Sequence, residues 1–190
     1  MKVIFLDHDG VICLVNQWGG RLKKRKKYIE EYGNITNDME MPYEYRFDDF
    51  DSKAVSVLNN ILEETGAEIV VSSDWKKWAT LEEMGEYYEK HGIIKKPIGY
   101  TTSILKSDLK FYNYFTELEE TRSYEILEYL DTHPEITHWV SIDDLNMSER
   151  IDEDTNEYFW GLKNFVWTPY EDEGIKQSGV KEKVIEFLVD

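Results

Sequence analysis

The chain has 190 residues, of which 41% are hydrophobic and 14% aromatic, and this composition excludes an intrinsically disordered protein. Its 39 acidic and 22 basic residues give a net charge of −17, which disfavours an extended nucleic-acid interface because such a surface repels a polyanion. We find no signal peptide and no apolar run near the roughly 18 residues that cross a bilayer. The lone Cys13 cannot form an internal disulfide, so we expect a single cytoplasmic domain over residues 1–190, with no membrane contact.

The first eleven residues combine a predicted strand with two carboxylates at its end. Residues 3–6 are continuously apolar, which is typical of a strand buried on both faces of a parallel sheet. Asp7 and Asp9 follow, and alternate side chains of an extended chain can point to the same side. Gly10 allows the backbone to turn away sharply. One carboxylate can attack phosphorus, its neighbour can move a proton, and both suit Mg²⁺, although acidic pairs also occur in ordinary surface loops.

Residues 13–50 show no clear periodicity, and we interpret them as a small insertion over the site. They contain Arg21 to Lys27, a run of six cations in seven residues. This run is equally consistent with a solvated surface and with a contact to phosphate or nucleic acid, so Lys24 and Arg25 are candidate substrate-binding residues. Trp18 could stack on a base, although packing is the commoner role of a tryptophan.

From residue 51 onwards, predicted helices alternate with predicted strands. This order predicts an α/β fold, a Rossmann-like parallel sheet with helices on both faces. The predicted strands lie over 68–71, within 98–101, over 138–142 and over 164–167. The first predicted helix is capped by Asp51 or Ser52 and ends at Gly66, and the second has the capping-box pair Thr80 and Glu83 and ends at His91-Gly92. The third is capped by Thr121 with Ile126, Leu127 and Leu130 inward, and the last follows Ser178 with Val180, Val184, Phe187 and Leu188 inward.

Polar residues follow these strands at the edge where the carboxyl ends of parallel strands meet. Ser72 and Ser73 follow the strand over 68–71, and Asp143 and Asp144 follow the strand over 138–142. Serine after a strand is more often a helix cap, but its hydroxyl can also donate to a phosphate oxygen. Because open α/β sheets bind ligands at this edge, the three strand ends predict one shared site.

These strand ends resemble the motifs of the haloacid dehalogenase-like (HAD) superfamily of phosphotransferases. Residues 5–11 look like its first motif, a hydrophobic strand followed by Asp-x-Asp-Gly, residues 69–72 like the second, and residues 141–144 like the acidic fourth. The third motif is a Lys or Arg before or within a helix. Arg122 is the best match for it, and Lys110 and Lys106 are alternatives.

Within the superfamily, four stretches resemble the HAD domain of Swiss Army knife RNA-repair proteins: 72–76, 122–130, 142–144 and 173–175. The resemblance covers residues 1–11 and most of 68–188, and it leaves 13–50 as a cap-type insertion. It implies a phosphomonoester hydrolase whose phosphorylated substrate is a nucleic-acid end or a nucleotide. A phosphatase for small phosphate esters and an inactive module that binds a nucleotide or a protein remain the alternatives.

The resemblance also implies a role for each site residue. Asp7 would form an aspartyl-phosphate, and Asp9 would be the general acid and base. Ser72 would donate to a phosphoryl oxygen and Arg122 would supply fixed positive charge, with Gly10 and Ser73 beside the substrate. The implied cofactor is Mg²⁺, held by Asp7, the backbone carbonyl of Asp9 and Asp143, with Asp144 in reserve. His8 lies at a variable position and is expected to have no catalytic role.

Overall fold

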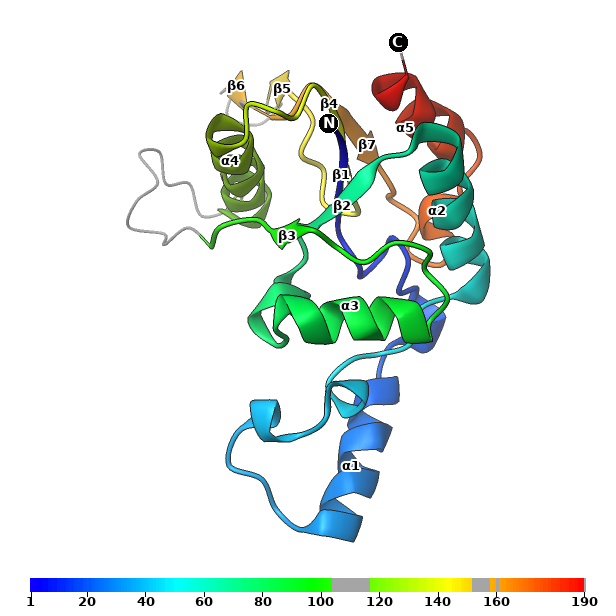
Figure 1. The fold of residues 1–190 in the computed structure, drawn as a ribbon, viewed down its shortest axis with the longest axis vertical. Helices are drawn as coiled ribbons and strands as arrows, with labels where there is room; N and C mark the ends of the chain where they lie inside the picture. The colour runs from blue at the N-terminus through cyan, green and yellow to red at the C-terminus, as the bar shows by residue number, and fades with distance from the viewer. Residues whose placement is uncertain (104–116, 152–157, 160, 190) are drawn as a thin grey trace.

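A computed structural model describes residues 1–103, 117–151, 158–159 and 161–189 of the chain. Its centre is a five-stranded sheet in the order β3-β2-β1-β4-β7, and every pairing in this sheet is parallel. Helix α4 covers one face of the sheet, and α2 and α5 cover the other (Figure 1). The predicted Rossmann-like α/β fold is therefore confirmed. Among the described residues, no helix is long and apolar enough to cross a membrane.

The strands and helices follow the predicted order closely. The sheet strands are β1 Lys2–Leu6, β2 Glu68–Val71, β3 Gly99–Tyr100, β4 His138–Asp143 and β7 Phe165–Trp167. The helices are α1 Gly20–Tyr32, α2 Ser52–Thr65, α3 Leu81–Lys90, α4 Glu117–Thr132 and α5 Val180–Leu188. An antiparallel pair that the sequence did not suggest, β5 Arg150–Ile151 and β6 Tyr158–Phe159, lies outside the main sheet.

Strand β1 is apolar throughout because both of its faces are covered. Ile4 and Leu6 pack in the core that α2 and α5 close, whereas Val3 and Phe5 pack in the core beneath α4. All four side chains are fully buried. A central strand of this kind shows no alternation of polar and apolar residues, and its first polar residue marks the edge of the sheet.

The topology brings the ends of β1 and β4 together. From β1 the chain continues to β2 and β3 on one side, and then returns to β4 on the other side of β1. Leu6 pairs with Val71 of β2 and with Ile142 of β4, so the residues that follow these three lie at one level. Such a reversal of strand order is where open α/β sheets bind ligands.

The predicted caps are right for two helices. Asp51 accepts hydrogen bonds from the backbone N–H groups of Lys53 and Ala54 at the start of α2. Thr80 and Glu83 form the expected capping box of α3. In both helices the cap satisfies backbone donors that have no partner within the helix.

Helix α4 differs from its prediction in two respects. It already includes Glu117, so Thr121 lies within the helix and does not cap it. Leu127, which was expected inward, is 41% exposed, whereas Tyr129 is buried with its ring edge-to-face with Phe5 at 5.7 Å. The buried face of this helix is formed by Ile126 and Tyr129 with Leu130 packed beside them, so the predicted inward positions of Ile126 and Leu130 are right and that of Leu127 is wrong.

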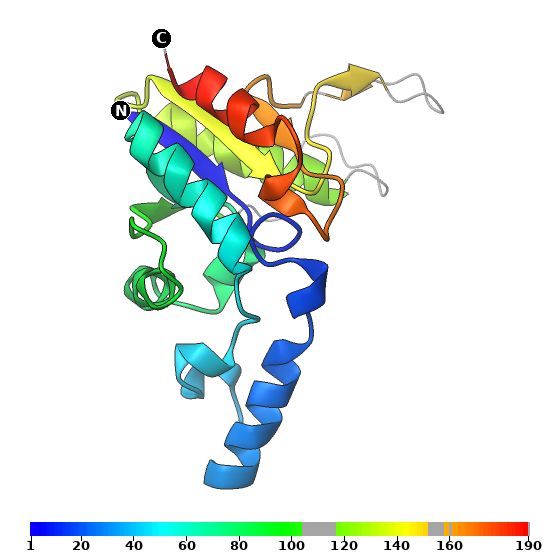
Figure 2. The ribbon, with the colours of Figure 1, turned by 90° about the vertical axis from the view of Figure 1, so that its right-hand side faces the viewer.

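The insertion of residues 13–50 is more regular than the sequence suggested. The basic run from Arg21 to Lys27 lies entirely within α1, which extends away from the sheet (Figures 1 and 2). No residue of α1 is buried, which explains why the sequence shows no apolar periodicity here. At its start, Gly19 has no side chain that could cap the helix. The buried carboxylate of Asp48 accepts from the backbone N–H of Arg21 at 2.6 Å and provides the cap from a distant segment.

We predict that Asp48→Ala loosens α1 more than the rest of the protein. Losing a cap costs about 1 kcal/mol, so backbone amides of residues 20–32 should exchange with deuterium about fivefold faster, while those of α2 change less. Hydrogen exchange followed by mass spectrometry measures both. Asp131→Ala, at an exposed position of α4, is the control. Unchanged exchange over residues 20–32 would contradict the capping role.

Candidate active site

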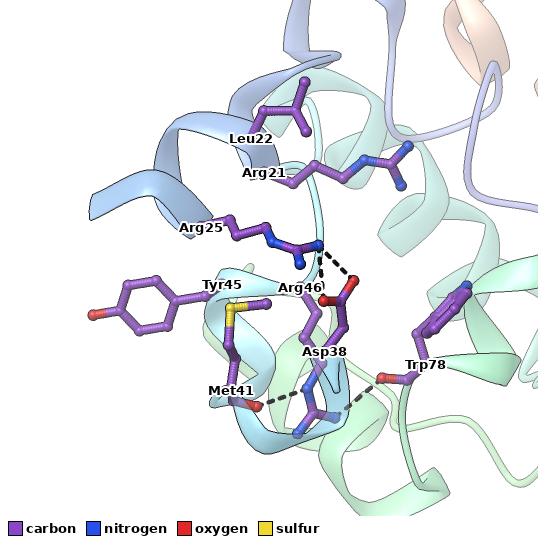
Figure 3. Close-up of a pocket in the computed structure, with 8 residues that line it drawn as sticks. All are labelled: Arg21, Leu22, Arg25, Asp38, Met41, Tyr45, Arg46 and Trp78. Atoms are coloured by element: carbon purple, nitrogen blue, oxygen red, sulfur yellow. Dashed lines mark hydrogen bonds and ion pairs between the residues drawn. The ribbon is translucent and has the colours of Figure 1, made fainter. Parts of the chain in front are cut away.

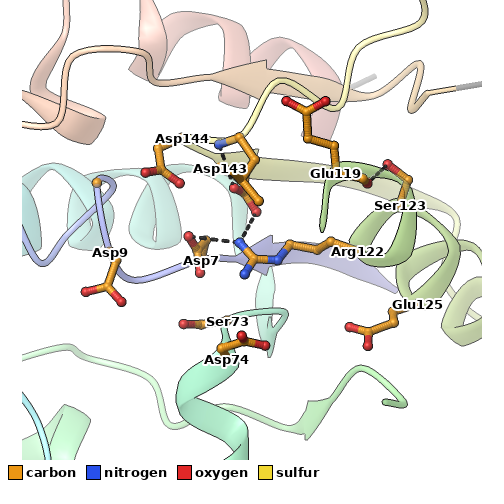
Figure 4. A network of polar contacts seen from close by, with 12 residues as sticks. Asp7, Asp9, Ser73, Asp74, Glu119, Arg122, Ser123, Glu125, Asp143 and Asp144 are labelled. Carbon is orange, nitrogen blue, oxygen red and sulfur yellow. Dashed lines mark hydrogen bonds and ion pairs between the residues drawn. The ribbon is translucent and has the colours of Figure 1, made fainter. Parts of the chain in front are cut away.

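Three aspartates meet at the carboxyl ends of β1 and β4. Asp7, Asp143 and Asp144 each offer a carboxylate oxygen, and these oxygens lie within 4.8 Å of one another (Figure 4). Asp7 is 3% exposed and Asp143 is fully buried, and a second oxygen of Asp143 accepts from the backbone N–H of Leu145 at 2.9 Å. Three converging carboxylates are the hard oxygen ligands that Mg²⁺ prefers, so the donor set fits this cation.

Arg122 links two members of this cluster. Its Nη1 lies 3.1 Å from Asp7 Oδ2 and 2.9 Å from Asp143 Oδ2. Burial alone would lower the pKa of Arg122, but the charges of Asp7 and Asp143 outweigh it and raise the pKa, so the guanidinium stays charged. Of the candidates for the third motif, Arg122 thus lies in the cluster, whereas Lys106 and Lys110 fall outside the described residues.

Burial and the closeness of the carboxylates raise the pKa values of Asp143 and Asp144. Burial raises the pKa of Asp143 well above its usual range, even though Arg122 acts in the opposite sense. Burial and then the charge of Asp7 raise the pKa of Asp144 to about 6. Carboxylates held this close repel one another, and a divalent cation relieves that repulsion better than one arginine can.

Asp9 lies next to the cluster without being part of it. Its Oδ2 accepts a hydrogen bond from the indole N–H of Trp75 at 2.9 Å (Asp9 is shown in Figure 4). Burial raises the pKa of Asp9, which favours the protonated form that a general acid needs. The carboxylate of Asp9 is not among the three clustered aspartates that could hold a cation. The predicted metal ligand at this position is the backbone carbonyl of Asp9, and no contact in the part of the chain that the structure describes tests it.

Gly10 lets the loop after β1 pass close to the cluster. Its φ of +67° is in the left-handed region that favours glycine, and a Cβ at this position would lie 2.5 Å from Asp144 Oδ2. Thr168 joins the loop after β1 to the end of β4. Its backbone N–H donates to the carbonyl of Asp143, and its hydroxyl donates to the carbonyl of Gly10. Any side chain at position 10 would displace Asp144.

Ser72 and Ser73 lie at the end of β2, beside Asp7. Ser72 N–H donates to the carbonyl of Leu6 at 3.1 Å, and its buried hydroxyl makes no hydrogen bond to any residue that the structure describes. A buried hydroxyl usually has a partner, and a phosphoryl oxygen would be one. Ser73 Oγ accepts from Trp75 N–H and caps the short turn of 3₁₀ helix over Asp74–Lys77.

The structure does not bring Lys24 and Arg25 into the aspartate cluster. Lys24 donates to Asp49 at 2.6 Å, and Arg25 pairs with Asp38 at 2.7 Å, so both charges are partly balanced within the insertion. Arg25 lines a separate pocket of about 380 Å³, shown in Figure 3. Its other lining residues are Arg21, Leu22, Asp38, Met41, Tyr45, Arg46 and Trp78.

Arg21 is the member of the basic run with the clearest electrostatic connection to the site. Its charge lowers the pKa of Asp9, against the larger opposite effect of burial. Its side chain is 54% exposed and its Nε lies 3.7 Å from Asp48. The sequence left this run open between a solvated surface and a phosphate contact, with Lys24 and Arg25 as the candidates, and no contact within the described ranges of the chain tests that choice.

Two further residues near the site were not predicted from the sequence. The sequence suggests no role for the indole of Trp75, which donates to Asp9. Lys76 is buried and donates to Glu125 at 2.5 Å and to Thr101 at 2.8 Å, which joins β2 and β3 to α4. These partners lie 66, 49 and 25 positions away in the chain, so no local pattern could have indicated them.

His8 packs among aromatic rings, whereas no contact among the described residues decides between packing and base stacking for Trp18. Burial, with the charge of Arg122 as a second cause, lowers the pKa of His8 to about 3, so its ring is neutral. The ring shares a hydrogen bond of 2.6 Å with the hydroxyl of Tyr88. The indole of Trp18 is 41% exposed and donates to the carbonyl of Cys13.

Comparison with known proteins finds the family but no individual relative. Neither the curated proteins nor the solved structures include a match to this chain. A family model described as the HAD domain in Swiss Army Knife RNA repair proteins matches residues 3–166. This range contains β1, β2 and β4, all three clustered aspartates and Arg122. The chain therefore belongs to the family of HAD domains found in Swiss Army Knife RNA repair proteins.

Proposed function

We propose that this protein is a Mg²⁺-dependent phosphomonoester hydrolase that acts through an aspartyl-phosphate, on nucleic-acid ends or nucleotides. Membership of the HAD family supports a phosphatase of the HAD type in general. The observation that carries the finer proposal is the cluster of Asp7, Asp143 and Asp144 with Arg122 bound between two of them. An inactive binding module would not need this complete set of charged groups.

In the first step Asp7 is the nucleophile. A carboxylate oxygen of Asp7 forms a bond to phosphorus while the bond between phosphorus and the leaving oxygen breaks. Asp9 donates its proton to that oxygen, in keeping with its raised pKa. Arg122, which contacts Asp7 directly, supplies positive charge where the phosphoryl oxygens must come close.

In the second step a water molecule attacks the phosphorus of the aspartyl-phosphate. Asp9, now ionised, takes the proton of the water, and the products are inorganic phosphate and the free carboxylate of Asp7. Mg²⁺ would be held by Asp7 and Asp143, with Asp144 beside them, and would neutralise charge on the phosphate dianion. The Ser72 hydroxyl, which is buried and has no hydrogen-bond partner among the described residues, would donate to a phosphoryl oxygen at the end of β2.

The pocket beside α1 supports a substrate larger than a simple phosphate ester. Its lining has three arginines and one aspartate, in a protein whose net charge is −17. The indole of Trp78 is 48% exposed there, and an aromatic face of this kind can stack on a nucleobase. In this proposal, one nucleotide chain would occupy the pocket while its terminal phosphate lies at the aspartate cluster.

We predict that Asp7→Asn lowers turnover by several orders of magnitude. The substitution keeps the shape of the side chain but removes the anion that attacks phosphorus. Phosphate release from an aryl phosphate and from a phosphate-ended oligonucleotide measures the loss, and circular dichroism confirms the fold. Asp131→Asn is the exposed control. A folded Asp7→Asn protein with more than about a tenth of wild-type turnover would rule out Asp7 as nucleophile.

We predict that chelation abolishes activity and that added Mg²⁺ restores it. Asp143→Asn should weaken Mg²⁺ binding by about tenfold or more, and Asp144→Asn by less, because Asp143 is fully buried and is the last residue of β4, where its pairing with Trp167 of β7 fixes it. Calorimetric titration with Mg²⁺ measures this without depending on activity. Undiminished hydrolysis in excess EDTA would contradict the metal requirement, and equal affinities would contradict only the ranking.

We predict that the pocket residues act on oligonucleotides alone. Trp78→Ala should raise the Michaelis constant for a phosphate-ended oligonucleotide about fivefold or more, since stacking of a base is worth about 1–3 kcal/mol. Arg21→Gln should raise it too and flatten its dependence on salt. Turnover of a small aryl phosphate should hardly change with Trp78→Ala. Lys27→Gln removes the same charge from an exposed site of α1 outside the pocket and is the control for Arg21→Gln. Equal effects of Arg21→Gln and Lys27→Gln, with none from Trp78→Ala, would favour the small-molecule phosphatase.

A further inference from the structure

Two aromatic rings of the insertion pack on Trp75, in the short turn that follows β2. The ring of Phe47 lies 4.6 Å from the indole of Trp75 at an angle of 11°, and the ring of Phe50 lies 5.4 Å away at 14°. Trp75 is only 3% exposed. Both phenyl rings come from the end of the insertion, where it returns to α2. The indole is therefore held by a part of the chain that contributes no residue to the aspartate cluster.

The polar end of the same indole holds the carboxyl group of Asp9. Trp75 Nε1 donates to Asp9 Oδ2 at 2.9 Å, and this N–H is the only donor that an indole has. The thiol of Cys13 also donates to Asp9, but a thiol is a weak donor. The carboxyl group of an aspartate turns easily about its last bond, so a rigid donor at this distance decides where its second oxygen points.

We infer that Trp75 is a positioning residue for the proton transfer by Asp9, and that Phe47 and Phe50 fix it in place. Catalysis by a general acid depends on distances of a few tenths of an ångström, and a displacement of 1 Å can cost a factor of about 100. The insertion then contributes to the reaction without touching the phosphate. This inference rests on the proposed function, in which Asp9 protonates the leaving oxygen.

Trp75→Phe tests the inference, because it keeps a stacked ring and removes the N–H. The expected result is a loss of about tenfold to a hundredfold in the single-turnover rate of alcohol release from an alkyl phosphate, whose leaving oxygen must be protonated. On an aryl phosphate with a stable phenolate as leaving group, the single-turnover rate of phenolate release should change less than about twofold, because this rate reports the first step and not the hydrolysis of the aspartyl-phosphate. KM should stay similar on both substrates. A residue needed only for folding would reduce both activities alike.

A double-mutant cycle ties the effect to Asp9. Asp9→Asn has no proton to give, so Trp75→Phe should cause no further loss on the alkyl phosphate in that background. Additive losses would overturn the inference. If Asp9→Asn slows the first-step release of the alcohol and of the phenolate equally, Asp9 is not the acid, and the proposed function fails together with the inference. If Asp9→Asn is selective for the alkyl phosphate but Trp75→Phe is not, only the inference fails.

Two further variants separate positioning from stability. Phe47→Leu weakens the stack and leaves the N–H of Trp75 in place, so it should give a smaller loss with the same selectivity for the alkyl phosphate. Its measurement also decides the matter if Trp75→Phe does not fold, since an unselective loss would overturn the inference. Trp139→Phe changes a partly buried indole beneath α4, packed edge-to-face on Phe5 at 5.9 Å, and should leave both activities unchanged.

Discussion

The mutual repulsion of buried carboxylates is the constraint on which this site depends. Asp7, Asp143 and Asp144 are drawn together by the ends of two adjacent strands, in surroundings that disfavour their charge. Arg122 offsets part of that cost, because its guanidinium contacts two of the three and remains protonated. Burial is the main cause of the raised pKa values of Asp143 and Asp144, and the charge of Asp7 adds to it while Arg122 acts in the opposite sense. The proposed Mg²⁺ would relieve this crowding, because it brings positive charge to the carboxylates.

The free-energy cost of the crowded carboxylates is offset by the apolar burial and the strand pairing of β1. The apolar residues of β1 are buried on both faces, and its ladder to β4 continues up to Leu6 and Ile142. At roughly 1.5–3 kcal/mol for each large apolar side chain, burial of this strand outweighs the penalty of a few crowded acids. Gly10 then allows the loop to fold back against Asp144 without a side chain in the way. The stability of the core and the chemistry of its edge thus come from consecutive residues of one strand and loop.

Features set by neighbouring residues in the chain could be predicted from the sequence, whereas contacts between distant residues could not. The order of strands and helices, the caps of α2 and α3, and the level of Asp7, Ser72 and Asp143 at one sheet edge all follow from local pattern and topology. Arg122 was selected by its resemblance to a motif, and its contacts place it in the cluster. The contacts of Trp75, Lys76 and Asp48 were not predictable, because each partner is 25 or more positions away and leaves no periodic trace. Helix α1 escaped notice for a related reason, since a helix without a buried face has no apolar period.

The insertion illustrates how a segment with little core of its own can still be ordered around a site. The Phe-Asp-Asp-Phe segment, residues 47–50, makes two kinds of contact. Its phenyl rings pack on Trp75, and Asp48 caps α1 while its carbonyl accepts from Tyr87 of α3 at 2.7 Å. Consequently α1, with Arg21 near its start, is anchored to the same few residues that hold the indole beside Asp9. The Phe-Asp-Asp-Phe segment thus connects α1 physically with the indole that contacts Asp9.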